Sequence, residues 1–386
     1  MNMPQRLVWD QPGWPQFTYD QRVVSTLLAD ARHSQGLAEG RLAAIGMAER
    51  TEILADAWAQ EAMATAKIEG EYLDLNSVRS SIARRLGTGG ARSGVTARDV
   101  EGLLDVMDSA IRSAKDALSE DQLKAWQLKL FPGGSQASFS LIRPVLAGEY
   151  RTAPMQIVSG SVGHETVHYI APPHERVPSE MRTFVAWVNQ GSATPTIVKA
   201  AIAHLWFETI HPFDDGNGRI GRALIDRIIA GEVGEFARLV RISEQLLERR
   251  DEYYKQLEFA QHGDLDITPW VGWFVEQFRD ACMSTVAIVD TAVVKATYRA
   301  RHANKSLNDR QRKFVDKMLE LGPAGFPDGL KSSKYESMTG AARATAYRDL
   351  ADLVQMGMLS SEGALKGTRY FMTIDGWGRP SVSVPE

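Results

Sequence analysis

Mostly apolar residues recur at helical spacing along this chain, and no other feature constrains its fold as strongly. One such series is Leu54, Ala57, Trp58, Ala62, Thr65 and Ile68, and another is Ile197, Ala200, Ala201, His204 and Leu205. Residues three or four apart lie on one face of a helix, so each series predicts a helix with a buried side. The sequence therefore predicts a mainly α protein.

Segment 150–173 is the exception to this pattern. Its β-branched and aromatic residues between Gln156 and Tyr169 predict a short β-hairpin, the one sheet expected in the central part of the chain. Glycine-rich stretches at 87–94 and 131–134 predict breaks between helices.

Length and composition are those of a soluble protein with two or three domains. The chain has 386 residues, of which 44% are hydrophobic and 24% charged, and single cores rarely exceed ~250–300 residues. Its single cysteine, Cys282, excludes an internal disulfide and fits a reducing compartment. No run approaches the ~18–20 apolar residues of a membrane span. We therefore expect a cytoplasmic protein without a membrane segment.

The charge balance changes toward the C-terminus. Residues 295–386 hold 15 Lys and Arg against 10 Asp and Glu, whereas the whole chain has a net charge of −4, which predicts a separate module. A short turn and a helix at 338–354, which include a candidate recognition segment at 342–348, precede a glycine-containing hairpin at 359–371. This order predicts a winged helix-turn-helix. Arg343 and Arg348 could contact DNA, and a role in protein interaction or dimerisation stays open.

One loop, residues 211–222, carries the clearest chemistry. A following proline forces His211 out of helical geometry, and Gly216-Asn217-Gly218 predicts a tight turn that enters a new helix. The first N–H groups of a helix have no internal partner, so such a turn is an anion site, usually for phosphate. Arg219 and Arg222 project from one side of the first turn and favour a polyphosphate.

Two further groups complete the loop. Asp215 precedes the turn, and a carboxylate beside phosphates is a natural Mg²⁺ ligand. His211, with an ordinary pKa near ~6.5, suits a general base for an incoming hydroxyl. Each of these residues alone is ordinary in a loop. Their coincidence within twelve consecutive residues predicts a site that acts on a phosphate-containing substrate.

The loop His211-Pro-Phe-Asp-Asp-Gly-Asn-Gly-Arg-Ile-Gly-Arg222 resembles the signature of the Fic family, with no departure from it. The resemblance implies a helical core that transfers AMP from ATP to Ser, Thr or Tyr hydroxyls of a protein target, or of the chain itself. It implies that His211 is the general base and that Asp215 binds Mg²⁺. The α-phosphate would lie in an anion hole made by Gly216, Asn217 and Gly218, and the outer phosphates would be held by Arg219 and Arg222, with Phe213 anchoring the loop. The sub-branch that phosphorylates its targets departs from this turn, so adenylylation is expected.

Other segments extend the resemblance. Residues 250–261 resemble the helix beside the adenine, which implies a base and ribose pocket lined by Tyr253, Tyr254 and Gln261. The hairpin at 156–169 resembles the flap that binds the target segment as an added strand. Residues 9–17 resemble the opening of a bacterial subgroup with its own N-terminal helical domain. A homodimer is common in the family.

Thr65-Ala-Lys-Ile-Glu69-Gly70 ends the helix that begins near Thr51. Read alone, Glu69 is a solvated helix-end residue, although a glutamate there is unfavourable for the helix dipole and suggests another partner. The segment resembles the Fic inhibitory motif, whose glutamate pairs with the second arginine of the signature, here Arg222. The resemblance implies autoinhibition through Thr65 and Glu69, because the γ-phosphate loses its arginine. The same glutamate can orient water in members that also remove AMP.

We therefore expect three parts: an N-terminal helical domain with the inhibitory helix at 1–95, a Fic catalytic core at 96–294, and a winged helix-turn-helix at 295–386. The first hypothesis is an autoinhibited AMP transferase. The second is a DNA-binding transcriptional regulator whose core senses a nucleotide. The presence of His211 favours the first, because a sensor has no need of a base.

Overall fold

The structure is a computed structural model, and it describes residues 7–88, 98–132, 145–159, 166–191, 193–364 and 367–377. Contacts divide the chain into two compact units, Met1–Val289 and Asp290–Glu386, and the boundary lies inside helix α12 (Thr268–Arg301). The predicted breaks at 87–94 and 131–134, and the tip of the predicted hairpin, fall wholly or partly outside the described residues. Within the described ranges, no helix is long and apolar enough to cross a membrane.

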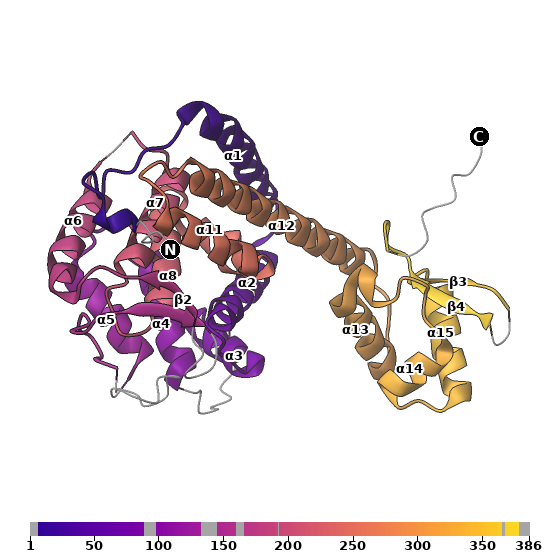
Figure 1. The fold of residues 1–386 in the computed structure, drawn as a ribbon. Helices are drawn as coiled ribbons and strands as arrows, with labels where there is room; N and C mark the ends of the chain where they lie inside the picture. The colour runs from indigo at the N-terminus through magenta and orange to yellow at the C-terminus, as the bar shows by residue number, and fades with distance from the viewer. Residues whose placement is uncertain are drawn as a thin grey trace. The chain divides into compact units, whose positions relative to one another are not determined.

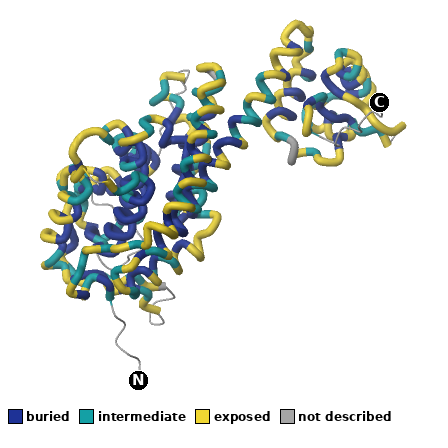
Figure 2. The backbone as a smooth tube through the Cα atoms, turned by 90° about the horizontal axis from the view of Figure 1, so that it is seen from above, coloured by how far each residue is buried: buried dark blue, intermediate teal, exposed yellow. Residues whose placement is uncertain are grey.

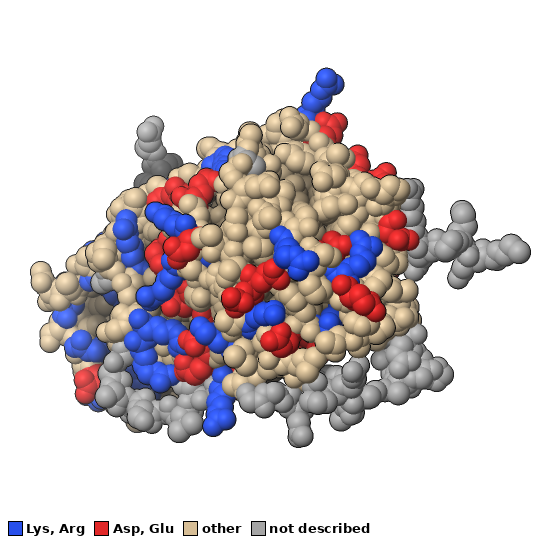
Figure 3. All heavy atoms as spheres, turned by 90° about the vertical axis from the view of Figure 1, so that its left-hand side faces the viewer, with Lys and Arg blue, Asp and Glu red and all other residues tan. Residues whose placement is uncertain are grey.

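The first unit is built mainly from helices, which confirms the predicted fold class (Figure 1). Before the hairpin these are α1 (Gln21–Ala43), α2 (Met47–Ile68), α3 (Leu75–Arg85), α4 (Arg98–Arg112) and α5 (Glu120–Leu130). After it come α6 (Val177–Asn189), α7 (Thr196–Ile210), α8 (Asn217–Val233), α9 (Ala237–Val240), α10 (Ile242–Glu248) and α11 (Arg250–His262). Short 3-10 helices lie at Val8–Asp10, His174–Arg176 and Gly234–Phe236. On the face drawn in Figure 3, basic and acidic side chains are interspersed.

Helices α7 and α8 form the centre of this unit. Every residue of α7 from Ala200 to Ile210 is buried, and a helix covered on all sides belongs in a core. The surrounding helices contribute large side chains to the same cluster, among them Trp58, Leu104, Trp126 and Phe184. Figure 2 shows the buried residues concentrated in the interior of this unit. The loop between α7 and α8 is therefore held at both ends by rigid elements.

The helices on both sides of residue 95 share this core. Ala62 and Ala66 of α2 and Val78 of α3 are buried in the same cluster as Phe207 of α7. Contacts place these helices in one unit, and the three-part division of the chain stays a prediction.

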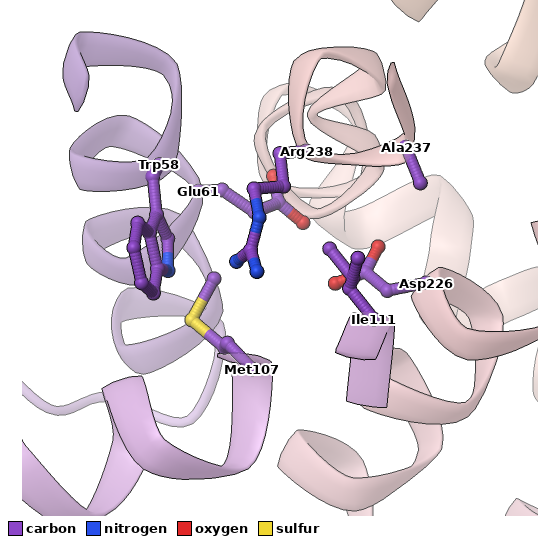
Figure 4. A pocket seen from close by; sticks show the side chains of 7 residues that line it. All are labelled: Trp58, Glu61, Met107, Ile111, Asp226, Ala237 and Arg238. Atoms are coloured by element: carbon purple, nitrogen blue, oxygen red, sulfur yellow. The ribbon is translucent and has the colours of Figure 1, made fainter. Parts of the chain in front are cut away.

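A buried carboxylate anchors α2 one turn before Thr65. The Glu61 side chain accepts the N–H groups of Ser243 and Glu244, at 2.8 and 3.2 Å, where α10 begins. Those N–H groups have no partner inside their own helix, so the carboxylate satisfies them. Figure 4 shows Glu61 lining a small cavity with Trp58, Met107, Ile111, Asp226, Ala237 and Arg238. Burial raises the pKa of Glu61.

The predicted hairpin is present as antiparallel strands β1 (Gln156–Ser159) and β2 (Thr166–Ile170). The Tyr169 hydroxyl donates to the Thr209 carbonyl at 2.9 Å, which fixes β2 to α7. Val158 and Val167 are 47% and 40% exposed. The hairpin thus presents apolar side chains to the surface while one tyrosine secures it to the core.

The second unit contains α13 (Asp309–Gly325), α14 (Ser332–Thr339), α15 (Arg343–Gln355) and the antiparallel strands β3 (Leu359–Glu362) and β4 (Arg369–Met372). Asn308 and Gln311 form a capping box at the start of α13. The buried carboxylate of Asp349 accepts hydrogen bonds from Asn308, Arg310 and the Tyr335 hydroxyl, which joins the three helices.

The loop before α8 depends on the buried ring of Phe213, and we expect Phe213→Ala to lower the free energy of unfolding by about 3–5 kcal/mol. Phe213 is 0% exposed and packs in the central cluster. Urea denaturation followed by tryptophan fluorescence measures the change. The matched control is Phe259→Ala, since Phe259 is 64% exposed and its loss should cost less than about 0.5 kcal/mol. Equal losses in the two variants would contradict this account of the loop.

Candidate active site

His211 ends α7 in a backbone conformation that is uncommon for a residue with a side chain. Its φ of 48° and ψ of 61° lie in the left-handed region, and its N–H donates to the Phe207 carbonyl at 2.9 Å. Such a conformation persists where the surroundings fix it, and it often accompanies a functional site.

Arg151 fixes the chain at this point. Its Nε donates to the His211 carbonyl at 2.8 Å, its Nη2 to the Ile210 carbonyl at 3.3 Å, and its backbone N–H to the Pro212 carbonyl at 2.9 Å. The last carbonyls of a helix need partners from outside the helix, and Arg151, only 2% exposed, supplies them. Arg151 is a functional residue that was not predicted from the sequence, because nothing in its spacing connects it with the loop.

The turn that follows is closed by Asn217. Its side chain accepts the Phe213 N–H and donates to the Phe213 carbonyl, both at 2.9 Å. Gly216 has a φ of 86°, and a Cβ there would lie 2.9 Å from Cε2 of Phe131. A side chain at position 216 is therefore excluded by both conformation and space. The turn is therefore shaped by the side-chain amide of Asn217 and by the lack of a Cβ atom in Gly216.

Helix α8 begins at Asn217, so the unpaired N–H groups of its first turn face the end of this loop. Asp215 Oδ1 accepts the Gly216 N–H at 2.6 Å and lies 3.5 Å from Nη2 of Arg219. In the described part of the chain, no three His, Cys, Asp or Glu side chains gather to hold a metal ion. Asp215 is therefore a single carboxylate beside the start of α8.

The imidazole of His211 is neutral at physiological pH. Burial lowers its pKa to about 4, and the Arg151 charge adds to that effect. His211 Nδ1 lies 3.7 Å from Oε2 of Glu208, whose own pKa is raised to about 8, first by burial and then by the Glu69 charge. A neutral imidazole can accept a proton, so the site supplies a base without prior deprotonation.

The end of α2 meets the start of α8 at Arg222. Arg222 Nε donates to Thr65 Oγ1 at 2.7 Å, and its Nη2 donates to the Thr65 carbonyl at 3.1 Å and to Glu69 Oε1 at 2.7 Å. Burial alone would raise the pKa of Glu69, but the charge and hydrogen bond of Arg222 bring it below the ordinary value. A Cβ at Gly218 would collide with Glu69 Oε1. The close approach of Glu69 therefore requires a glycine in the turn.

A second carboxylate of the same segment contacts the other arginine. Both oxygens of Glu71 lie within 3.0 Å of Nη1 of Arg219, at 2.9 and 3.0 Å. Glu71 was not predicted from the sequence, although its position two residues after Glu69, across a glycine, is a signal that could have identified it.

The three residues predicted to line an adenine pocket differ in exposure. The Tyr254 ring is 38% exposed, beside the Arg250 guanidinium, 4.9 Å from its centroid. Tyr253 is 1% exposed, and its hydroxyl bonds His204 Nε2 at 2.7 Å in the core. Gln261 is 6% exposed. Packing thus leaves Tyr254 as the ring that a purine could reach.

The central segment of the chain matches a known protein family. Residues 117–229 match the Fic/DOC family, so the chain contains a Fic domain with the loop 211–222 inside it. Residues 7–88, which include α2, match a family described as a domain of unknown function (DUF4172).

The chain is similar to curated proteins over part of their length. It is 37% identical to a probable protein adenylyltransferase of Aquifex aeolicus over 24% of this chain and 26% of that protein. It is 24% identical to the protein adenylyltransferase Fic of Nematostella vectensis over 57% of this chain and 48% of that protein. The chain thus spans less than half the length of each. A Fic family protein from Desulfovibrio desulfuricans shares the fold, with a TM-score of 0.55, 23% identity, and coverage of 93% of this chain and 98% of that one.

We expect the His211 imidazole to stay neutral between about pH 5.5 and pH 8, because burial and the Arg151 charge lower its pKa to about 4. NMR titration of the imidazole Hε1 signal measures this, with assignment from the His211→Gln spectrum. Arg151→Met should raise the midpoint, since it removes a repelling charge. A midpoint near the ordinary value of ~6.5 in the unaltered chain would show a solvated imidazole.

Proposed function

We propose that the chain is a protein adenylyltransferase that moves AMP from ATP to a hydroxyl of a protein target or of itself. One observation carries the proposal: a neutral His211, whose side chain is 17% exposed, lies in the loop that opens the N-terminus of α8, where the buried Arg219 and Arg222 add two cations. A base beside an anion site fits attack of a hydroxyl on a phosphate. The names of the curated relatives support the same reaction.

In the proposed reaction, the hydroxyl oxygen of the target bonds to the α-phosphorus of ATP. The bond between that phosphorus and the oxygen bridging to the β-phosphate breaks, and pyrophosphate leaves. His211 takes the proton of the hydroxyl. The turn Gly216-Asn217-Gly218 holds the α-phosphate, Arg219 and Arg222 hold the outer phosphates, and Tyr254 stacks on the adenine.

Asp215 would hold Mg²⁺ together with phosphate oxygens of ATP, and the ion would offset charge on the departing pyrophosphate. Arg151 is a positioning residue in this scheme, since it contacts the His211 carbonyl and not the imidazole. The hairpin would bind the target segment as an added strand at its edge. The single buried thiol, Cys282, suits the reducing environment of the cytoplasm, where we place the protein.

We propose further that Thr65 and Glu69 inhibit the enzyme. Their contacts occupy Nε and Nη2 of Arg222, the donors that a γ-phosphate would use. Two anions cannot both bind one guanidinium at full strength, and Glu69 is already in place at the end of a packed helix. ATP would then bind in a pose unsuited to transfer. The same carboxylate could orient water for removal of AMP.

Glu69→Gly should increase labelling of the chain or of a lysate protein by α-³²P-ATP at least tenfold, because it frees Arg222. Adding His211→Ala should lower that labelling by roughly 10²–10⁴-fold and leave ATP binding nearly intact. Autoradiography in the presence of Mg²⁺ measures both. Equal labelling of the unaltered chain and Glu69→Gly would reduce Glu69 to a helix-end residue, and full labelling with His211→Ala would remove His211 from the mechanism.

A second candidate function, duplex DNA binding, concerns the C-terminal unit. Its order of elements fits a winged helix-turn-helix with α15 as the recognition helix, and Arg343 and Arg348 of α15 are exposed. We expect Arg343→Ala/Arg348→Ala to weaken binding of a labelled duplex and to reduce its salt dependence. Fluorescence anisotropy at several salt concentrations measures this. Binding that is absent, or equal in the variant, would contradict a DNA-binding role for these two arginines.

A further inference from the structure

The chain reverses direction immediately after α2, and the reversal is built by Gly70. With a φ of 82°, Gly70 is in the left-handed region. Its N–H donates to the Lys67 carbonyl and the Glu71 N–H donates to the Ala66 carbonyl, both at 3.0 Å. These two bonds form a Schellman motif, which ends a helix in one defined geometry. The residues on either side of Gly70, two glutamates, are therefore held in a fixed relation to each other.

The remaining end carbonyls of α2 are bound by arginines from other helices. The Thr65 carbonyl accepts from Nη2 of Arg222 at 3.1 Å. The Ile68 carbonyl accepts from Nε and Nη2 of Arg250, in α11, at 3.1 and 2.9 Å. Since an unpaired carbonyl at a helix end is costly, these bonds stabilise the docked position of α2. The glutamates that follow are thus presented to α8 by a fully bonded helix end.

Glu71 meets Arg219 in this docked position. Both carboxylate oxygens contact Nη1 of Arg219, whose side chain is 6% exposed and lies over the Phe131 ring, 5.1 Å from its centroid. The guanidinium has little room to turn toward a second anion while it is held there. A surface ion pair contributes little, but this one engages a nearly buried arginine at the anion site.

We propose that Glu71 is a second inhibitory carboxylate, which occupies Arg219 as Glu69 occupies Arg222. The inference rests on the proposed function and adds a second inhibitory contact to its regulation. Glu71 and the outer phosphates of ATP compete for the same donors, so Glu71 weakens ATP binding. AMP has no outer phosphates, so its binding does not depend on Glu71. Full activity then requires the end of α2 to release both arginines together.

Calorimetric titration of the full chain with ATP or with AMP, in the presence of Mg²⁺, tests the proposal. Glu71→Gln removes the competing charge and keeps the shape, and we expect it to tighten ATP binding about fivefold to tenfold and to leave AMP binding unchanged. Glu71→Ala should do the same, so the result does not depend on the amide. Asp99→Asn is the matched control, because Asp99 is exposed and its charge also acts on the Glu71 carboxyl; it should change ATP affinity by less than about twofold.

Each contrary outcome has a distinct meaning. Unchanged ATP affinity in both Glu71 variants, with strong labelling by Glu69→Gly, would overturn the second inhibitory role and leave the proposed function standing. An equal gain for ATP and AMP would overturn it too, since it would mean general opening of the site. Failure of every variant, including Glu69→Gly, to bind ATP or to label would reject the proposed function itself. Melting curves of the variants separate these results from loss of fold.

Discussion

The guanidinium of Arg222 is the group on which the candidate site depends. It is 2% exposed and binds the side chain and carbonyl of Thr65 together with the carboxylate of Glu69. A buried cation is costly unless its donors are paired. The end of α2 therefore stabilises the buried guanidinium as long as no other anion binds Arg222. A polyphosphate is such an anion. In the proposed inhibition, the contact with α2 and a bound polyphosphate therefore compete for the same guanidinium.

The other contacts that shape the site do not depend on which anion binds Arg222. Glu61 ties α2 to the start of α10, Arg151 holds the end of α7, and Asn217 closes the turn before α8. These contacts do not involve Arg222, so the loop can keep its shape when the arginine changes partners. In the proposed reaction His211 is likewise ready to act as the base, because burial keeps its imidazole neutral.

The sequence predicts much of this site because the decisive residues are close together along the chain. Helical periodicity identifies α7 and α8, and the glycines between them identify an anion site at a helix start. Arg151 could not be found this way, because it reaches the loop across about 60 residues and only tertiary packing connects the two. Tyr253 and Tyr254 show the same limit, since packing alone determines which ring is buried. Local sequence patterns predict functional groups that lie close together along the chain. Contacts between distant helices can be identified only once the fold is known.

The most direct test of the account compares the position of the label in ATP, using the Glu69→Gly chain with Mg²⁺. Transfer of AMP keeps the α-phosphate and releases the other two as pyrophosphate. We expect protein to become labelled from α-³²P-ATP and not from γ-³²P-ATP, and we expect the added Arg222→Ala to abolish the label. Labelling from the γ-position would mean phosphorylation, and labelling that survives the loss of Arg222 would contradict the role given to this arginine.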